Sequence, residues 1–185
     1  DEMSSRGLGD VYKRQNQQLA WVDRGSEEAS TLWACVQDNN TGLLWEVKSG
    51  DAASPHFYEL KYSWYSADNN TNGGNAGLEN TNNCNGVACN TQAYIDYLNN
   101  LNYCGSSQWR LPTVNELMTI VVTANLDLVV DESYFSYTKN DQYLSSQTLA
   151  SDRARAWYLY FSDGSTGYAP KTSPNYVRLV SKEVQ

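Results

Sequence analysis

The chain has 185 residues and a net charge of −8, with 41% hydrophobic but only 18% charged residues. This length fits one domain with a hydrophobic core, and the 14 tyrosines and 6 tryptophans exclude a disordered chain. The composition is not that of a helical bundle. The acidic charge argues against nucleic acid and anionic membrane surfaces as partners. No apolar run is long enough to cross a bilayer, so direct membrane insertion is not expected.

The first residues are interpreted as foreign to the protein. Ser5 to Gln15 read SRGLGDVYKRQ, which is the in-frame translation of a transposase-type sequencing adapter. We therefore treat residues 1–15 as an assembly artefact, residues 16–32 as an N-terminal lead-in and residues 33–185 as the domain. We expect the natural N-terminus to be missing, so the lack of a signal peptide carries no information on location.

Cysteine usage points to an exported protein. The four cysteines are an even number in a domain rich in Asn and Tyr, which predicts two disulfides. Cys84 and Cys89 flank NGVA in a polar loop and are predicted to pair. Cys35 and Cys104 would then close a long loop, which restrains the unfolded chain more strongly. The alternative is a zinc site, but there is no C-x-x-C spacing and His56 is the only histidine.

In chain order, the first predicted elements are short strands around a polar turn. The turn QDNNTG precedes the apolar run LLWEV, which predicts a strand. Residues 56–68 alternate aromatic and polar residues and are predicted as a strand or an extended segment. Residues 66–90 are rich in Asn and Gly, but the flanking aromatics and the cysteine pair favour an ordered long loop.

Two helices are predicted next. TQAYIDYLNNLNYCG places Tyr94, Leu98 and Leu101 on one helical stripe with Ile95 beside it, and Gly105 is expected to end this helix. The second helix is predicted within PTVNELMTIVVTAN. Its expected buried stripe is Leu117, Ile120, Val121 and Ala124.

The junction before the second helix carries a strong start signal. Thr113 is the expected N-cap and Glu116, three residues on, completes a capping box, while Pro112 can pack on Leu117 as a hydrophobic staple. Trp109 leads in from an extended segment, and Arg110 points to the other side and needs an acidic or carbonyl partner. No base or nucleophile lies beside them in sequence, so we interpret the junction as structural.

The last third of the chain reads as β structure. DQYLSSQ predicts a strand, RAWYLYFSDGSTGYAP predicts a hairpin around an Asp-Gly turn, and NYVRLVS predicts a closing strand. The order of elements predicts an α+β domain in which two helices lie against a small antiparallel sheet with long loops.

The motifs WACVQDNNTGLLWEVK, QWRLPTVNEL, AWYLYFSDG and NYVRLV occur in the order and spacing of a bacterial family, the Lcl C-terminal domain family. It is typified by the C-terminal domain of a collagen-like adhesin. The WYSADNNTNGGNAG loop and the C-x-x-x-x-C pair also resemble this family, and the resemblance covers roughly residues 33–181. It implies a C-type lectin-like fold and a non-catalytic adhesion or recognition module in the periplasm, on the cell surface or secreted.

This chain departs from the family in two places. The segment Leu144-Ser145-Ser146 stands where members often carry Trp-Ser-Ser, so packing there should differ. The collagen-like stalk of the type adhesin is absent, so its trimeric assembly is not carried over and a homo-oligomer remains open. The glycosaminoglycan binding associated with the type adhesin is not carried over either, because polysulfated ligands need a basic surface.

The resemblance also suggests where a ligand binds, since some relatives diversify their C-terminal loops. Loops around residues 136–153 and 162–175 combine aromatic faces with hydrogen-bonding tips, as antibody loops do. The predicted partner is an extracellular glycan or surface protein, and the predicted contact residues are Tyr137, Asn140, Tyr143, Tyr168 and Asn175. The alternative is that these polar loops are simply solvated.

No organic cofactor is predicted, but one loop offers oxygen ligands for calcium: Asp68, Asn69, Asn72, Asn75 and Glu79. The alternative is that this Asn-rich stretch only makes turns, and it lacks EF-hand spacing.

An enzyme is not expected. The RLPT segment is similar to formylglycine-generating enzymes, but such an oxidase would need cysteines late in the domain, and all four lie before residue 105. A Ser-His-Asp triad would depend on His56 alone, without a G-x-S-x-G elbow. A structural part of a pilus, envelope or fibre assembly is the remaining alternative to a binding module.

Overall fold

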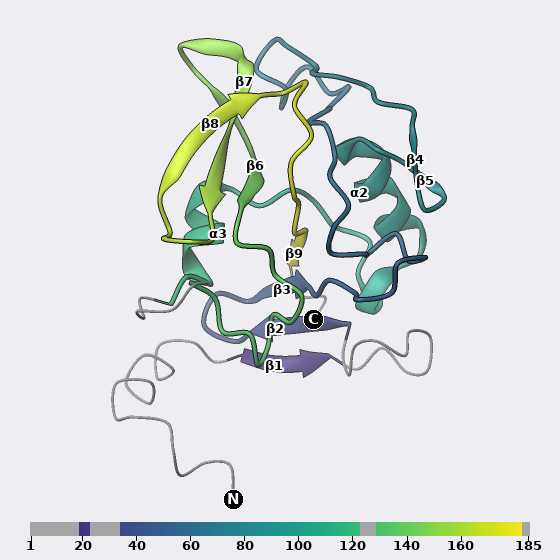
Figure 1. Cartoon of the computed structure of the whole chain (residues 1–185), viewed down its shortest axis with the longest axis vertical. Helices are drawn as coiled ribbons and strands as arrows, with labels where there is room; N and C mark the ends of the chain where they lie inside the picture. The colour runs from purple at the N-terminus through teal and green to yellow at the C-terminus, as the bar shows by residue number, and fades with distance from the viewer. Residues whose placement is uncertain (1–18, 23–33, 123–128, 183–185) are drawn as a thin grey trace, which may run out of the picture.

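Figure 1 shows the computed structural model, which describes residues 19–22, 34–122 and 129–182. In these ranges the chain forms three small antiparallel sheets, two α-helices and one 3₁₀ turn. The elements are β1 (Leu19–Val22), β2 (Cys35–Asp38), β3 (Leu43–Glu46), β4 (Asn83–Cys84), β5 (Val87–Ala88), α2 (Thr91–Asn100), η1 (Tyr103–Gly105), α3 (Val114–Thr119), β6 (Gln142–Leu149), β7 (Asp152–Tyr160), β8 (Thr166–Pro170) and β9 (Val180–Lys182).

The predicted α+β class is confirmed, but the prediction of a single sheet is wrong. The strand orders are β1-β2-β3-β9, β4-β5 and β6-β7-β8. The closing strand pairs with β3, with Trp45 opposite Val180, instead of extending the β7–β8 hairpin. The four-stranded sheet therefore joins strands from the two ends of the domain. In Figure 1 both β6–β8 and α2 lie above this sheet, β6–β8 to the left and α2 to the right.

The first helix is shorter than predicted. Its N-cap is Asn90, whose side chain accepts a hydrogen bond from the Ala93 N–H at 2.9 Å. Tyr94 and Leu98 are buried as expected. Leu101 is 53% exposed, because the helix ends at Asn100 and the chain turns away at the next residues. The assignment of Leu101 to the buried stripe was therefore wrong.

The capping box before α3 is confirmed. Thr113 Oγ1 accepts from the Glu116 N–H at 3.1 Å, and Glu116 Oε2 accepts from the Thr113 N–H at 2.8 Å. The Arg110 guanidinium donates to both Glu116 carboxylate oxygens, at 2.8 and 2.6 Å. Burial alone would raise the pKa of Glu116, but the hydrogen bonds from Arg110 and Thr113 lower it. Glu116 is thus the acidic partner that Arg110 was expected to need.

The rest of the junction is structural as well. Trp109 is 2% exposed and its indole N–H donates to the Tyr103 carbonyl at 2.9 Å. Pro112 is buried, and its carbonyl accepts from the Ser146 N–H at 2.8 Å. Leu117 is buried too. The junction therefore ties α3 to η1 and β6.

In the second helix, Ile120 is buried with Leu117, while Val121 is half-buried. Ala124, also predicted for this stripe, lies outside the described residues. Helix α3 ends at Thr119, so the stripe continues only one residue beyond it, into the C-cap Ile120.

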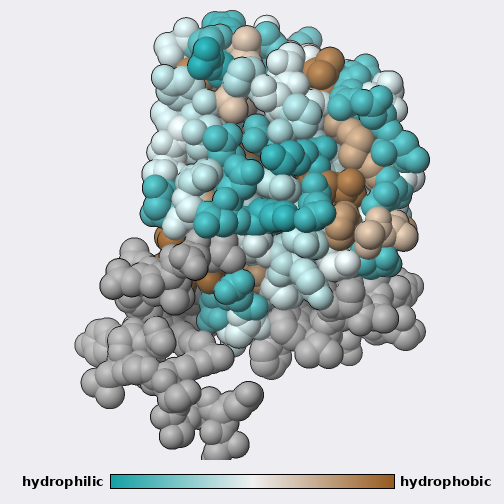
Figure 2. Space-filling view, viewed as in Figure 1, coloured by the Kyte–Doolittle hydropathy of each residue, from teal (hydrophilic) through white to brown (hydrophobic). Residues whose placement is uncertain are grey.

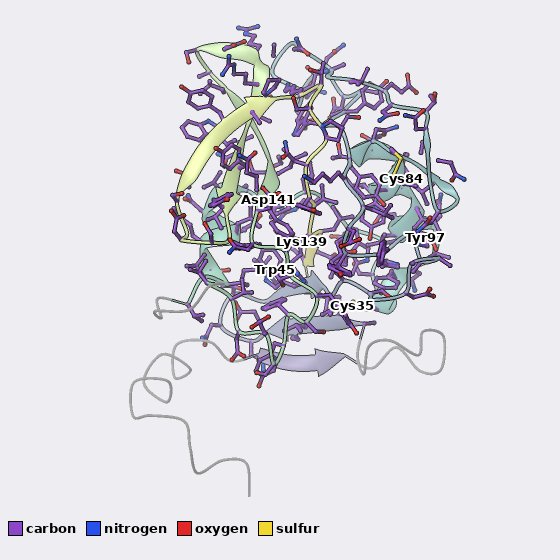
Figure 3. All side chains as sticks on the ribbon, viewed as in Figure 1. Cys35, Trp45, Cys84, Tyr97, Lys139 and Asp141 are labelled. Carbon is purple, nitrogen blue, oxygen red and sulfur yellow. A yellow bond between two sulfur atoms is a disulfide. The ribbon has the colours of Figure 1, made fainter. Side chains whose placement is uncertain are left out.

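Both predicted disulfides are present. Cys35 pairs with Cys104 across 69 residues of sequence, and Cys84 pairs with Cys89 across 5. The first bridge fastens β2 to η1, and the second closes the β4–β5 hairpin. Figure 3 shows the Cys84 bridge beside α2. None of the helices among the described residues is long and apolar enough to span a membrane.

Two hydrophobic clusters fill the interior. One joins α2 to the aromatic segment that precedes the long loop, and it contains Trp64, Tyr94 and Trp109. The other joins β3 and α3 to the β6–β7 hairpin, and it contains Trp45 and Leu117. The buried hydrophobic residues lie mostly in these two clusters. The face in Figure 2 is largely hydrophilic apart from hydrophobic patches beside α2.

Candidate ligand-binding site

Two of the five predicted ligand-binding residues are buried. Tyr143 is 1% exposed; its ring lies 4.6 Å from that of Phe161 and its hydroxyl accepts from the Lys139 N–H at 2.9 Å. Asn175 is 8% exposed, and its backbone N–H and carbonyl both pair with Tyr62. Tyr143 and Asn175 belong to the fold, so their assignment to a ligand surface is corrected.

Tyr137 and Asn140 are exposed and lie in the segment before β6. The Tyr137 ring centre is 5.4 Å from that of Tyr58, and the ring covers Gly50, where an added Cβ would lie 2.6 Å from Tyr137 Cζ. Lys139 extends across this surface, 4.7 Å from the centre of the Tyr58 ring. Figure 3 shows Lys139 and Asp141 in this segment.

Tyr168 lies on a separate aromatic surface on β7 and β8. It is 48% exposed and sits directly opposite Trp157 in the strand pairing. The two rings meet nearly at a right angle, 89°, with centres 5.8 Å apart. The guanidinium carbon of Arg155, two residues before Trp157 on the same face, is 5.5 Å from the Tyr168 ring centre. We call Arg155, Trp157 and Tyr168 the hairpin face.

The hairpin face keeps hydrogen-bonding capacity for a ligand. Within the described part of the chain, neither the Trp157 indole N–H nor the Tyr168 hydroxyl has a partner. Arg155 Nε donates to Asp152 at 3.0 Å, which holds the guanidinium beside the ring. On the opposite face of the same hairpin, the Tyr158 ring covers Gly167, where an added Cβ would lie 2.4 Å from the tyrosine hydroxyl. The Tyr158 ring is therefore part of the packing of the hairpin.

Arg155 and Trp157 were not among the predicted contact residues, although the sequence holds the signal for them. The hairpin pairs positions symmetrically about Ser162 and Asp163. With this centre Trp157 lies opposite Tyr168, whereas the predicted Asp163-Gly164 turn would place Leu159 there and Trp157 two residues along on the same face. The two strands of a hairpin share their faces at paired positions, so an exposed Tyr168 implies an accessible Trp157.

The proposed calcium loop is built largely from its own hydrogen bonds. Asp68 Oδ1 accepts from the Asn70 N–H, Asn72 Oδ1 from Gly74, and Asn75 Oδ1 from Gly77. The Asn72 side chain also donates to Asn69 Oδ1 at 3.1 Å, while Glu79 lies farther along and contacts Tyr65.

The same loop already holds a positive charge from the protein. Lys171 is 1% exposed, and its ammonium donates to the carbonyls of Asn72 and Asn75 at 2.8 and 2.6 Å. It also lies 3.8 Å from the centre of the Trp64 ring. Burial lowers the pKa of Lys171 to about 8. The described residues hold no group of three or more His, Cys, Asp or Glu side chains suited to a metal, and calcium binding by this loop stays a prediction.

A buried charge cluster lies between β3 and the end of the chain. The fully buried Glu46 carboxylate accepts from Lys48 Nζ at 2.8 Å and from the Leu179 N–H at 2.9 Å, and it contacts His56 and Tyr94. Sequence reasoning missed this cluster, although charges inside the apolar run LLWEVK were a signal.

Arg178, also fully buried, extends this cluster and donates to the Glu46 carbonyl at 2.7 Å. Burial alone would raise the pKa of Glu46, but Lys48, His56 and Leu179 together lower it well below its ordinary value. Every charged member is out of contact with solvent, so the cluster fastens the C-terminal segment to β3.

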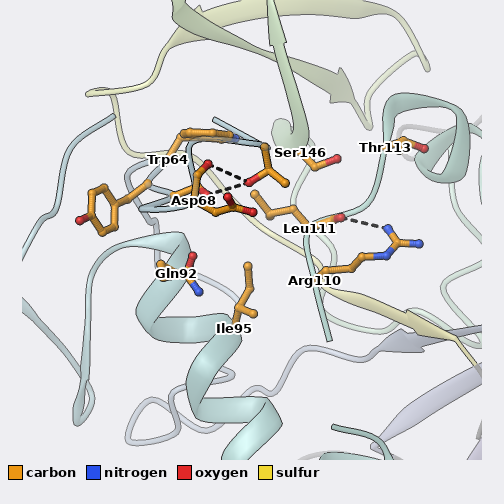
Figure 4. Close-up of a pocket in the computed structure, with 11 residues that line it drawn as sticks. Trp64, Asp68, Gln92, Ile95, Arg110, Leu111, Thr113 and Ser146 are labelled. Atoms are coloured by element: carbon orange, nitrogen blue, oxygen red, sulfur yellow. Dashed lines mark hydrogen bonds between the residues drawn. The ribbon is translucent and has the colours of Figure 1, made fainter. Parts of the chain in front are cut away.

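A cavity of about 640 Å³ opens between α2, the loop after Trp64 and the helix junction. Its lining residues are Trp64, Tyr65, Ser66, Asp68, Thr71, Gln92, Ile95, Arg110, Leu111, Thr113 and Ser146. In Figure 4, Gln92 and Ile95 project from α2 on one side, and Arg110 extends beside Leu111 with its guanidinium directed at the Leu111 carbonyl. The junction interpreted as structural thus also forms one wall of a cavity.

The sequence profile of the Lcl C-terminal domain matches residues 34–181. The chain belongs to the Lcl C-terminal domain family. No curated protein and no solved structure is significantly similar to this Lcl C-terminal domain. The C-type lectin-like architecture therefore stays a prediction.

Proposed function

We propose that this Lcl C-terminal domain is a non-catalytic, exported recognition module that binds an extracellular glycan through the hairpin face. Family membership supports an adhesin-like module, and the two disulfides are consistent with an oxidising compartment outside the cytoplasm. The acidic chain makes a neutral or weakly acidic glycan a better partner than a polysulfated one.

The observation that carries this proposal is the exposed Tyr168 ring beside Trp157. The Tyr168 hydroxyl and the Trp157 indole N–H both lack a hydrogen-bond partner in the described part of the chain. Aromatic rings stack on the apolar C–H faces of sugars, and their polar tips can bond to sugar hydroxyls. Arg155 adds a donor of fixed position at the edge of the same surface. A sugar ring could therefore meet an apolar face and two or three hydrogen-bond donors at once.

A binding role is also favoured over catalysis by where the histidine lies. His56 is 2% exposed, and its ring stacks on Tyr103 with centres 4.5 Å apart. Its Nδ1 lies 3.0 Å from Glu46 Oε1. A histidine enclosed in this way cannot exchange protons with a substrate bound at the surface.

The test is a glycan-array screen with the domain displayed in several copies, because a single module of this kind binds weakly. Tyr168→Ala and Trp157→Ala are each expected to lower binding about fivefold or more; the stacking of a nucleic-acid base on an aromatic side chain, worth roughly 1–3 kcal/mol, serves as the guide. Tyr137→Ala is the matched control, because it removes an exposed tyrosine from the other aromatic surface.

If Tyr137→Ala abolishes binding and Tyr168→Ala does not, the ligand binds beside Tyr58 and the assignment to the hairpin face is wrong. If the domain binds surface proteins but no glycan, the ligand is a protein and not a glycan, and the hairpin face is still the proposed binding surface. Retained melting temperatures in all three variants would show that the losses are not caused by unfolding.

A further inference from the structure

We propose that the cavity between α2 and the helix junction is a second, separate binding site, and that its ligand is a small organic amine with an aliphatic body. This site shares no residue with the hairpin face. Its volume of about 640 Å³ falls within the range of small-molecule sites, roughly 300–1,000 Å³.

The wall of the cavity suits an aliphatic body. Leu111 and Trp64 line it and are themselves 5% and 2% exposed, so they are fixed by the core behind them. Ile95 projects into it from the half-buried side of α2 (Figure 4). Side chains that are already packed lose little conformational entropy when a ligand binds, so this wall is preorganised.

The charge of the cavity selects a cation. Arg110 lines it, but both carboxylate oxygens of Glu116 accept from its guanidinium, so this pair carries no net charge. Asp68, an exposed residue, also lines the cavity, and among the described residues its Oδ1 accepts only from the neutral N–H groups of Asn70. In the described part of the chain, no lysine or arginine forms an ion pair with Asp68.

One nearby cation, the guanidinium of Arg153, could have neutralised Asp68, but it contacts another part of the loop. Arg153 of β7 sits against Gly74, where an added Cβ would be 2.7 Å from its Nη1. It makes no ion pair with Asp68. The cavity is therefore left with one unbalanced carboxylate.

Two further acceptors lie on the cavity wall. The Gln92 side chain donates to Asp96, which leaves its carbonyl oxygen without a donor among the described residues, and the Ser146 hydroxyl has no partner there either. An ammonium group carries three donors and no acceptor. One carboxylate and two neutral oxygens are the complement of such a group, although a single ligand need not reach all three.

The domain already binds one ammonium group with the same kind of partners. Lys171 Nζ is held by two carbonyl oxygens and by the ring of Trp64, which also lines the cavity. Oxygen acceptors and an aromatic ring of this long-loop region can thus hold an ammonium group out of water. The proposed ligand would use the same chemistry with the addition of a carboxylate.

The test is an NMR titration of the domain with n-pentylamine, which is cationic at pH 7, and with 1-pentanol as a neutral probe of equal chain length. The Trp64 indole N–H, bonded to the Ser145 carbonyl at 2.9 Å, and the Gln92 side-chain amide are the reporters. The amine is expected to shift both signals in a saturable way, with an affinity about fivefold higher than that of the alcohol.

Asp68→Asn is expected to lower the affinity for the amine about fivefold and to leave that for the alcohol unchanged, because only the charge of an exposed carboxylate is removed. The new amide oxygen can still accept from Asn70, so the loop should keep its turn. Glu132→Gln is the matched control: it removes one exposed negative charge away from the cavity and should change the affinity less than about twofold.

Equal binding of amine and alcohol would show that the cavity recognises only an apolar chain and would overturn the proposal. So would an affinity for the amine that is unchanged in Asp68→Asn, or the absence of saturable shifts at Trp64 and Gln92. The comparison of the two probes on the unmodified domain decides the matter even if Asp68→Asn perturbs the loop. Since neither reporter lies on the hairpin face, failure here leaves the proposed glycan binding untouched.

Discussion

The ammonium group of Lys171 lies 3.8 Å from the centre of the Trp64 ring, while both side chains are 2% exposed or less. Lys171 follows β8 directly, and Trp64 opens the long Asn/Gly loop, so this contact joins two segments about a hundred residues apart in sequence. The two carbonyls that Lys171 also binds belong to the loop itself. Lys171 thus helps to hold the long loop on the hairpin, together with Thr148 of β6, whose hydroxyl donates to the Asn72 carbonyl at 3.1 Å.

Replacing this lysine should loosen the loop. Lys171→Met keeps an aliphatic chain but leaves the Asn75 carbonyl without its donor and the Asn72 carbonyl without its buried charged one, which should cost about 2 kcal/mol of unfolding free energy. Lys182→Met, which changes an exposed lysine, should stay within about 0.5 kcal/mol of wild type. Urea unfolding measures both, and equal stability of the two variants would contradict the role given to Lys171.

The buried Glu46 should make the domain sensitive to acid. Its pKa is lowered in the folded domain relative to the ordinary value of 4.5, so below about pH 4.5 the unfolded chain binds a proton that the folded domain does not. The stability that Glu46 contributes is therefore complete above this pH and is lost as the pH falls below it.

Melting curves between pH 7 and pH 3 would measure this dependence. Glu46→Gln should destabilise the domain at pH 7 by roughly 3–5 kcal/mol, because Lys48 loses its buried partner. It should also flatten the fall in stability at low pH. Glu132→Gln, an exposed control, should keep the slope of wild type; an unchanged slope in Glu46→Gln would refute the assignment.

Trp109 should be essential to the fold and not to binding. Trp109→Ala should destabilise the domain by about 3–5 kcal/mol, because it empties a large buried volume and removes the indole hydrogen bond to the Tyr103 carbonyl. Thr113→Ala, which removes the cap of α3, should cost only about 1 kcal/mol. Denaturant titrations of the two variants would give this order, and a Trp109→Ala protein as stable as wild type would show that the ring is not part of the core.

The two disulfides should contribute unequally. Loop-closure entropy predicts about 4 kcal/mol for the bridge across 69 residues and about 2 kcal/mol for the bridge across 5. The double variant Cys35→Ser/Cys104→Ser should therefore melt well below Cys84→Ser/Cys89→Ser. Calorimetry on the two proteins would decide, and the opposite order would mean that the β4–β5 hairpin carries more of the stability than its short loop indicates.

The sequence by itself determined the features that depend on neighbours along the chain. Thr113 and Glu116 are three residues apart, and this spacing alone makes a capping box once a helix begins. The Asp-Gly signal predicted the β7–β8 hairpin in the same way, although the strands pair about Ser162 and Asp163, one residue earlier. The cysteine count with its loop context was enough to pair all four cysteines.

Only the tertiary structure decided which side chains reach solvent and which distant groups meet. Tyr143 and Tyr168 look alike in sequence, but one packs on Phe161 in the core and the other stands on the outer face of a hairpin. The contact of Lys171 with the loop of Asn72, and the return of β9 to β3, join positions about a hundred residues or more apart. Burial depends on the packing of all elements together, and no local pattern in the chain carries that information.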